Sequence, residues 1–297
     1  MSRQSSEGPV NPEAVLISAK GATYALLEPL GEPGGSGTAF LALCTSGKMR
    51  GIPFAVKFFL SGNEARRRSF LEEIAFLQNE THPAILAVYD SGTTYNRVPF
   101  YISRHMSATL EDVIVQGEAP LLDKLLFASQ LCAALAFLSS TEPKIVHRDV
   151  KPKNIFVNGR TCVLGDFGMM HRTGDTEVDP GMPKAYRTPE LVRHLAGGGP
   201  VTPASDLYQL GLVLYRLFTG INPLLPCIDR SDPIILAPLP EVETVFGPIL
   251  NNVLPATLAE DPERRTRLDV LQEIFIRLAE REGRQRALSE RRFESAS

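Results

Sequence analysis

A short polar stretch in the middle of the chain carries residue types that readily do chemistry. Residues 147–154 read HRDVKPKN and combine a histidine, an arginine, an aspartate, two lysines and an asparagine. The flanking residues, 145–146 and 155–157, are apolar and typical of short β-strands. We therefore expect a loop that is fixed at both ends, and proteins often place catalytic or binding side chains in such loops.

A glycine-rich stretch closer to the N-terminus is suited to holding an anion. Residues 30–42 read LGEPGGSGTAFLA, and their glycines allow backbone N–H groups to approach a phosphate closely. No GK[ST] follows, so the stretch is not a P-loop. A strand follows it and not a helix, which excludes the dinucleotide-binding fingerprint. A glycine-rich hairpin turn explains the same residues equally well.

A lysine on the next predicted strand is a candidate partner for the same anion. Lys57 ends the run AVK between apolar neighbours, where a charge is costly unless it is paired. Glu73 lies beside the apolar face that Phe70, Ile74 and Leu77 give to the following helix. A Lys57–Glu73 pair would hold the ammonium group toward the glycine turn as a clamp on phosphate oxygens. A surface lysine and a solvated glutamate remain the alternative.

Hydrophobic patterning predicts that a β-rich part comes first. A helix capped by Asn63 interrupts this part. The strand-like runs are separated by glycine and proline and cover residues 24–31, 38–45, 52–60, 85–89 and 98–103.

A larger helical part follows, and the boundary is predicted near residues 104–108. A cleft between two such parts is a common ligand site. The helical runs cover residues 110–116, 121–140, 205–220 and 268–282.

Composition excludes several classes of protein. A net charge of −3 with mixed signs argues against nucleic acid as the main partner. The most apolar run, residues 121–139, contains charged residues and is predicted to be a buried helix, so no membrane span is expected. The N-terminus lacks the apolar core of a signal peptide. Four scattered cysteines favour reduced thiols and a cytoplasmic location; they are Cys44, Cys132, Cys162 and Cys227.

The chain resembles the eukaryotic-type serine/threonine protein kinases from about residue 22 to residue 281. The resemblance rests on motifs that occur in the expected order and spacing. These motifs are LGEPGGSGTAF, AVK, FLEEI, HRDVKPKN, DFG, TPE, SDLYQLG and DPERR.

The resemblance implies a role for each residue of the central loop. Asp149 would orient the substrate hydroxyl and accept its proton, and Lys151 would contact the transferred phosphate. Asn154 and Asp166 would hold Mg²⁺, since amide and carboxylate oxygens suit a hard cation. Phe167 of DFG would pack into the core.

The resemblance also implies the ATP site and two structural ties. Lys57, paired with Glu73, would contact the phosphates. Glu190 would pair with Arg265, and Asp206 would tie its helix to the central loop. The adenine and phosphate contacts would come from Gly31, Gly34, Gly35, Gly37, Ala39, Ala55 and Phe156.

Control by phosphorylation is implied as well. Arg148, beside the catalytic aspartate, marks kinases that are regulated through the segment between DFG and TPE. Thr173 and Thr176 are the candidate autophosphorylation sites there. The alternative is that both threonines are solvated loop residues without a regulatory role.

Two departures from the family pattern affect the site. Pro33 lengthens the glycine stretch by one residue, and Met182 replaces a threonine that normally touches the catalytic aspartate and lysine. These changes keep open a pseudokinase that acts as a scaffold or nucleotide sensor, although Lys57, Asp149, Asn154 and Asp166 are all present. A small-molecule phosphotransferase is the second alternative, but such enzymes usually lack TPE followed by SDLYQLG.

The expected fold class is α+β, with the bilobal arrangement of a protein kinase. The domain would span residues 22–281, with an N-lobe at 22–103 and a C-lobe at 104–281. Residues 1–21 would be a flexible extension and 282–297 a polar C-terminal tail. Protein substrates with serine or threonine acceptors, ATP and Mg²⁺ are the implied partners and cofactors.

Overall fold

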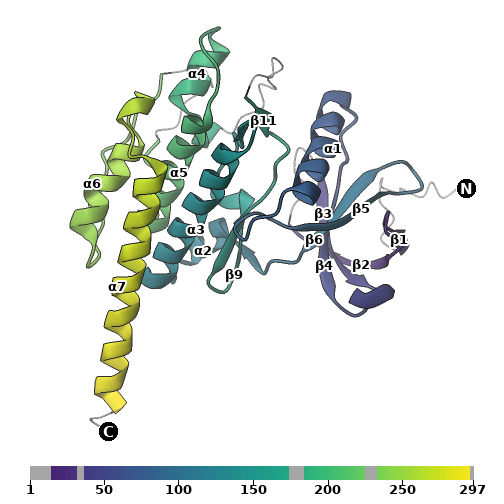
Figure 1. The fold of residues 1–297 in the computed structure, drawn as a ribbon, viewed down its shortest axis with the longest axis horizontal. Helices are drawn as coiled ribbons and strands as arrows, with labels where there is room; N and C mark the ends of the chain where they lie inside the picture. The colour runs from purple at the N-terminus through teal and green to yellow at the C-terminus, as the bar shows by residue number, and fades with distance from the viewer. Residues whose placement is uncertain (1–14, 32–36, 174–183, 225–232, 295–297) are drawn as a thin grey trace, which may run out of the picture. The chain divides into compact units, whose positions relative to one another are not determined.

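The computed structural model describes residues 15–31, 37–173, 184–224 and 233–294. Contacts within the chain define two compact units (Figure 1). Of the described residues, the first unit comprises those up to 82 together with 86–106, and the second comprises 83–85 together with those from 107 onward. The expected α+β class is confirmed, because strands dominate the first unit and helices the second.

The first unit is built on a six-stranded antiparallel sheet with the order β1-β2-β3-β4-β6-β5. The α-helix α1 (Glu64–Asn79) accompanies the sheet. The strands are β1 (Val15–Ile17), β2 (Thr23–Pro29), β3 (Thr38–Cys44), β4 (Pro53–Phe58), β5 (Val88–Thr93) and β6 (Pro99–Arg104).

Alternation along the strands of this sheet directs one set of side chains into a core. On β4, Phe54, Val56 and Phe58 are buried while the residues between them are partly exposed. Tyr24 of β2 meets the ring of Phe54 edge to face, and Ile102 of β6 is fully buried in the same core. The opposite face of β4 is therefore left for polar side chains.

Helix α1 begins where the sequence predicts. The side chain of Asn63 accepts a hydrogen bond from the backbone N–H of Arg66, which caps the helix. Phe70, Ile74 and Leu77 are buried, and so is Glu73. The helix therefore presents one carboxylate from its apolar side.

Two features of this unit differ from the expectation. Residues 15–17, expected within a flexible extension, form β1, where Leu16 is buried and its two neighbours are exposed. Strand β5 lies at 88–93 and not at 85–89, because Asp90, Ser91 and Gly92 gain backbone pairing with β6 despite their low β-propensity.

The second unit contains α2 (Leu110–Gln116), α3 (Leu121–Ser140), α4 (Pro189–Leu195), α5 (Pro203–Thr219), α6 (Gly247–Thr257) and α7 (Leu268–Glu294). Its short strands are β7 (Ala108–Thr109), β8 (Ile145–Val146), β9 (Ile155–Asn158), β10 (Thr161–Leu164) and β11 (His171–Arg172). Strands β7, β9 and β10 form one small sheet, and β8 pairs with β11. The central polar stretch therefore lies between β8 and β9, as predicted.

Helix α3 is the most apolar helix of the second unit. Its length and hydropathy alone would allow it to cross a membrane. However, eight of its residues are buried, and it packs beside α7 and α5 (Figure 1). A buried core helix explains its composition, as expected.

Helix α7 is longer than expected. Residues 282–294, predicted as part of a polar tail, continue the helix that begins at Leu268. The segment is rich in residues that favour helices, and the ion pairs Arg277–Glu273 and Arg284–Glu280 link successive turns of the same helix. The segment is therefore a polar extension of the last helix.

Candidate active site

Lys57 lies on a central strand of the first unit, on the face turned away from the core. It is opposite Ala39 of β3 and Tyr101 of β6 in the strand register. Its Nζ atom lies 3.1 Å from Oε1 and 3.4 Å from Oε2 of Glu73. The predicted Lys57–Glu73 pair is therefore present.

The Glu73 carboxylate is fully buried and has a second partner. The hydroxyl group of Tyr101 donates a hydrogen bond to Oε1 of Glu73 at 3.0 Å. The Tyr101 ring stacks on Phe70, and the Lys57 ammonium lies 5.7 Å from the centre of each ring. A tyrosine opposite Lys57 was not predicted as part of the site, because an aromatic residue in a strand is usually a core residue.

The residues expected to line the nucleotide share a face of this sheet. Ala39 is opposite Lys57, and Ala55 lies two residues before Lys57 on β4. Both side chains are only partly buried, so they do not belong to the core on the other face.

One glycine of the glycine-rich stretch is required by the backbone. Gly37 has φ +155°, and a Cβ atom there would lie 1.8 Å from the carbonyl oxygen of Phe58. Gly31 has φ +73°, also a conformation that favours glycine. Gly34 and Gly35 lie outside the described residues, so their phosphate role remains a prediction.

In the second unit, α5 holds the central loop by its backbone. The Asp206 carboxylate accepts hydrogen bonds from the N–H groups of His147 and Arg148 at 2.7 and 2.8 Å. Gln209, one turn later, accepts from the N–H of Val150 and donates to the carbonyl of Arg148. The predicted role of Asp206 is thus observed.

Gln209 was not predicted, although the sequence contains a signal for it. It is a fully buried amide in an otherwise apolar part of α5, and buried amides are normally hydrogen-bonded. It also donates to the carbonyl of Tyr186 at 2.8 Å. One side chain therefore ties the central loop to the segment before α4.

The loop holds the Asp149 carboxylate by one of its two oxygens. Oδ2 accepts hydrogen bonds from Lys151 Nζ at 2.7 Å and from Asn154 Nδ2 at 2.8 Å. The same Asn154 nitrogen donates to the backbone carbonyl of Asp149. Oδ1 is buried and accepts no hydrogen bond within the described part of the chain. A buried carboxylate oxygen without a donor is unusual in a folded protein and points to a ligand.

Burial raises the pKa of Asp149 above that of an ordinary aspartate. The nearby Lys151 ammonium and the Asn154 amide oppose this shift, and the Asp166 carboxylate adds to it. Asp149 is therefore a stronger base than a solvated aspartate, while the cation beside it favours the ionised form.

The residues proposed for the metal offer suitable oxygens. Asn154 uses its amide nitrogen toward Asp149, and its oxygen accepts no hydrogen bond within the described ranges. Asp166 is close enough to Asp149 to raise its pKa, and the backbone of Gly165 donates to the carbonyl of Asn154. Amide and carboxylate oxygens of this kind fit Mg²⁺.

Phe167 and His147 pack together beside the loop that carries Asp149. Phe167 is fully buried, as predicted, and its ring meets His147 at a centroid distance of 4.5 Å. His147 also contacts the carbonyl of Gly165 at 3.1 Å.

Phe156, expected to lie under the adenine, is partly exposed on β9. It is opposite Val163 of β10 and Thr109 of β7 in the strand register.

A second predicted ion pair braces the helices of this unit. Arg265 and Glu190 pair directly, and both are almost completely buried. Arg265 also donates to the carbonyls of Ala204 and Ala259.

Thr173, a candidate phosphorylation site, donates its backbone N–H to the carbonyl of Lys144. Met182 and Thr176 lie outside the described residues, as does Pro33.

Comparison with known families gives a consistent result. Residues 24–267 match the model of the protein kinase domain. This range includes the residues around Lys57 in the first unit and those around Asp149 in the second.

Individual relatives are similar over part of their length. The serine/threonine-protein kinase PknB of Mycobacterium tuberculosis is 34% identical over 205 residues, and that of Mycobacterium leprae is 32% identical over 203 residues. Each alignment covers 62% of this chain and 31% of the relative. Cyclin-dependent kinase F-3 of rice is 31% identical over 166 residues, which is 54% of this chain and 37% of the relative.

Proposed function

Because the chain belongs to the protein kinase family, we propose that it transfers the γ-phosphate of ATP to serine and threonine hydroxyls of proteins, its own chain included. One observation carries the proposal. The buried Asp149 carboxylate has one oxygen held by Lys151 and Asn154, while its other oxygen has no donor among the described residues. A substrate hydroxyl suits that oxygen as a donor, and phosphoryl transfer depends mainly on positioning and charge stabilisation.

Nucleotide binding is assigned to residues of the glycine-rich stretch and of strands β3, β4 and β9. Lys57, held by Glu73, contacts phosphate oxygens, and the N–H groups around Gly31, Gly34, Gly35 and Gly37 approach the same phosphates. Ala39 and Ala55 pack on the adenine, and so does Phe156. The exposure of Ala39 and Ala55 on the face that carries Lys57 supports this assignment.

Asn154 and Asp166 are assigned to Mg²⁺. When bound, the ion neutralises charge on the phosphates of ATP. The chain contributes the oxygens of these two residues and fixes Asn154 through its hydrogen bonds to Asp149. Asp149 and Asp166 raise each other's energy when both are ionised, so a cation beside them would stabilise the pair.

In the proposed reaction, the substrate hydroxyl donates its hydrogen bond to Oδ1 of Asp149. Its oxygen attacks the γ-phosphorus in line with the bond to the β-phosphate. The new oxygen–phosphorus bond forms as that bond breaks, the electron pair leaves with ADP, and the proton passes to Asp149. Lys151 stabilises charge on the transferred group, as the 2.7 Å contact with Asp149 allows.

The proposal is tested by incubating the chain with γ-labelled ATP, Mg²⁺ and a general acceptor protein. Mass spectrometry then identifies the labelled residues. Label on serine and threonine of the acceptor or of the chain supports the proposal. Nucleotide binding without transfer would indicate a pseudokinase, and transfer confined to small molecules would indicate a phosphotransferase of another class.

We also propose that the protein acts in the cytoplasm, where ATP is supplied. Its described cysteines support a reducing compartment, because Cys44, Cys132 and Cys162 are buried and carry free thiols. Labelling of these thiols in denatured protein taken directly from cells would test the point. Oxidised cysteines would contradict it.

A further inference from the structure

Gln209 of α5 is fully buried, and its side-chain amide joins two separate segments of the second unit. Oε1 accepts a hydrogen bond from the N–H of Val150 at 2.9 Å, and Nε2 donates to the carbonyl of Arg148 at 2.9 Å. Nε2 also donates to the carbonyl of Tyr186 at 2.8 Å, in the segment before α4. Both donors of the amide and one lone pair of its oxygen are therefore used.

The two bonds to the central loop lie on either side of Asp149. The carbonyl of Arg148 belongs to the peptide bond that precedes Asp149, and the N–H of Val150 belongs to the peptide bond that follows it. Gln209 therefore fixes both peptide groups that flank the Cα atom of Asp149. The oxygen and nitrogen of one amide are rigidly connected, so a shift of the Tyr186 carbonyl must disturb these two bonds or break the third.

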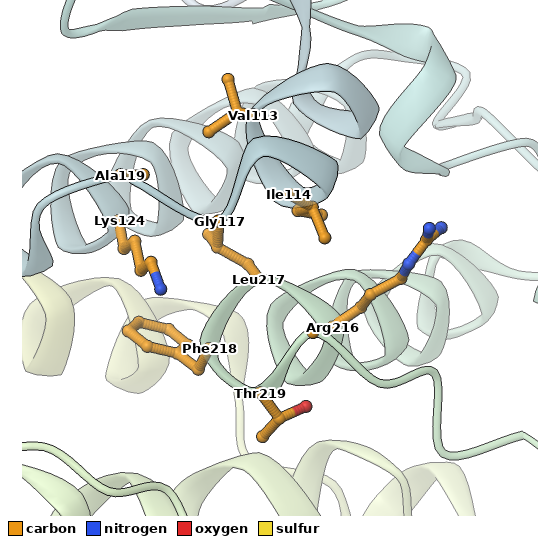
Figure 2. Close-up of a pocket in the computed structure, with 10 residues that line it drawn as sticks. Val113, Ile114, Gly117, Ala119, Lys124, Arg216, Leu217, Phe218 and Thr219 are labelled. Atoms are coloured by element: carbon orange, nitrogen blue, oxygen red, sulfur yellow. The ribbon is translucent and has the colours of Figure 1, made fainter.

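Tyr186 is also held at its other end by α5. Arg216, two turns after Gln209, donates to the Tyr186 hydroxyl at 3.1 Å and makes two hydrogen bonds to the Glu111 carboxylate, at 2.6 and 2.7 Å. Figure 2 shows Arg216 extending from α5 away from Phe218. Within the described residues, Gln209 is the one side chain of α5 that bonds to both this segment and the central loop.

We propose that Gln209 is a positioning residue that makes the placement of the Asp149 carboxylate depend on the position of the segment around Tyr186. The inference rests on the proposed function, because it assigns Gln209 a role in placing the proton acceptor of that reaction. The chain between Asp166 and α4 leads to Tyr186, so a change in this part of the chain reaches Asp149 through a neutral amide. This route differs from the pairing of a phosphate with Arg148, because it involves no charge.

Replacing Gln209 tests the positioning role. Gln209→Met keeps the approximate length of the side chain but makes none of the three hydrogen bonds, and it should lower kcat about 10- to 100-fold. KM for ATP should not change, because Gln209 bonds to none of the residues assigned to the nucleotide. Gln130→Met on α3 is the matched control, since Gln130 also accepts from a backbone N–H, that of Cys162, and donates to a carbonyl, that of Arg160. It should lower Tm and leave kcat unchanged.

A double-mutant cycle with Tyr186→Phe separates coupling from a loss of stability alone. This change removes the hydroxyl that Arg216 holds and so loosens the segment. It should lower kcat at least about threefold when Gln209 is present and should have no further effect in Gln209→Met, because residues of one network are not additive. Equal effects of Tyr186→Phe in the two backgrounds would overturn the proposal, and so would a normal kcat in Gln209→Met.

Hydrogen exchange, followed by NMR on the full chain without nucleotide, tests the coupling independently of activity. The Val150 N–H should exchange about tenfold faster in Gln209→Met and also faster in Tyr186→Phe, whereas the His147 N–H, which Asp206 holds, should keep its rate. If Gln209→Met does not fold, Tyr186→Phe alone decides, and an unchanged rate at Val150 would overturn the proposal. If wild type transfers no phosphate, the proposed function fails and the positioning role fails with it, whereas a failure of the coupling alone leaves transfer by wild type intact.

Discussion

Asp149 and Lys57 are charged residues whose side chains are held in place by buried hydrogen bonds and ion pairs. Asp149 shares one oxygen between Lys151 and Asn154, and its other oxygen has no donor within the described residues. Lys57 is held against a carboxylate that is fully buried. Each contact fixes a charged group that would otherwise move, and fixed charges are what phosphoryl transfer requires.

Replacing Lys57 by methionine should remove activity. The change deletes the charge proposed to act on phosphate oxygens, and a loss in kcat of about 10²-fold or more is expected. Glu73 retains the Tyr101 hydrogen bond, so the chain should still fold, with a lower Tm because a buried carboxylate loses its cation. Circular dichroism and turnover with labelled ATP measure both effects. Lys48→Met, at an exposed lysine, serves as the control.

The activity should depend on pH through Asp149. This carboxylate must be ionised to accept a proton, and burial raises its pKa. The acid limb of kcat/KM should therefore fall at a pH above the ordinary aspartate value of about 3.9. An inflection at or below that value would contradict the assignment. A limb that persists in Asp149→Asn would arise from another group, such as Asp206, whose pKa burial raises to about 7.

At the scale of elements, α5 does most to position the catalytic loop. Asp206 and Gln209 lie one turn apart and together bind three N–H groups and one carbonyl of residues 147–150. Arg148 has φ +68°, a conformation that is costly for a residue with a side chain. The hydrogen bonds from α5 compensate for that cost.

Replacing Asp206 by asparagine should therefore disturb the loop without touching the proposed substrate position. The amide oxygen of asparagine can accept a hydrogen bond from one of the two backbone N–H groups. Its NH₂ group would face the other N–H, so two donors would meet, which should cost about 1–3 kcal/mol of stability. We expect kcat to fall at least about tenfold with little change in KM for ATP. Urea unfolding and steady-state kinetics measure these effects. Asp269→Asn, on the exposed start of α7, is the matched control, and a normal kcat in Asp206→Asn would refute the positioning role.

The elements also show what a sequence can and cannot predict. Helices α1, α3 and α5 follow from their apolar spacing, and the Lys57–Glu73 and Arg265–Glu190 pairs follow from the family resemblance. Strand β1 and the bonds of Gln209 depend on contacts with distant segments, which local propensity does not contain. That Oδ1 of Asp149 has no donor among the described residues likewise follows only from three-dimensional packing.

At the scale of the whole molecule, the residues assigned to the reaction are divided between the two units. Lys57 belongs to the first unit and Asp149 to the second. The segment between Asp166 and α4 is the natural place for control, because Gln209 links its end at Tyr186 to the loop that carries Asp149. Part of this segment, residues 174–183, lies outside the described residues.

Phosphorylation of this segment is predicted to raise activity. A phosphate on Thr173 or Thr176 adds roughly −1.5 to −2 charge, which Arg148 is suited to pair with. The double variant Thr173→Ala, Thr176→Ala should lose the segment phosphate and show lower turnover than wild type after both are treated with ATP. Equal turnover with no phosphate on the segment would mean that Asp175, Glu177 and Asp179 already supply the charge, or that none is needed.

The most direct test of the whole account compares wild type with Asp149→Asn in a single-turnover assay with γ-labelled ATP, while nucleotide affinity is measured in parallel. Asparagine keeps the size of the side chain but cannot take the proton. We predict phosphate transfer to serine and threonine by wild type, a rate reduced about 10²- to 10⁴-fold in the variant, and similar ATP affinity for both. Equal transfer rates for the two proteins, or no transfer by wild type, would contradict it.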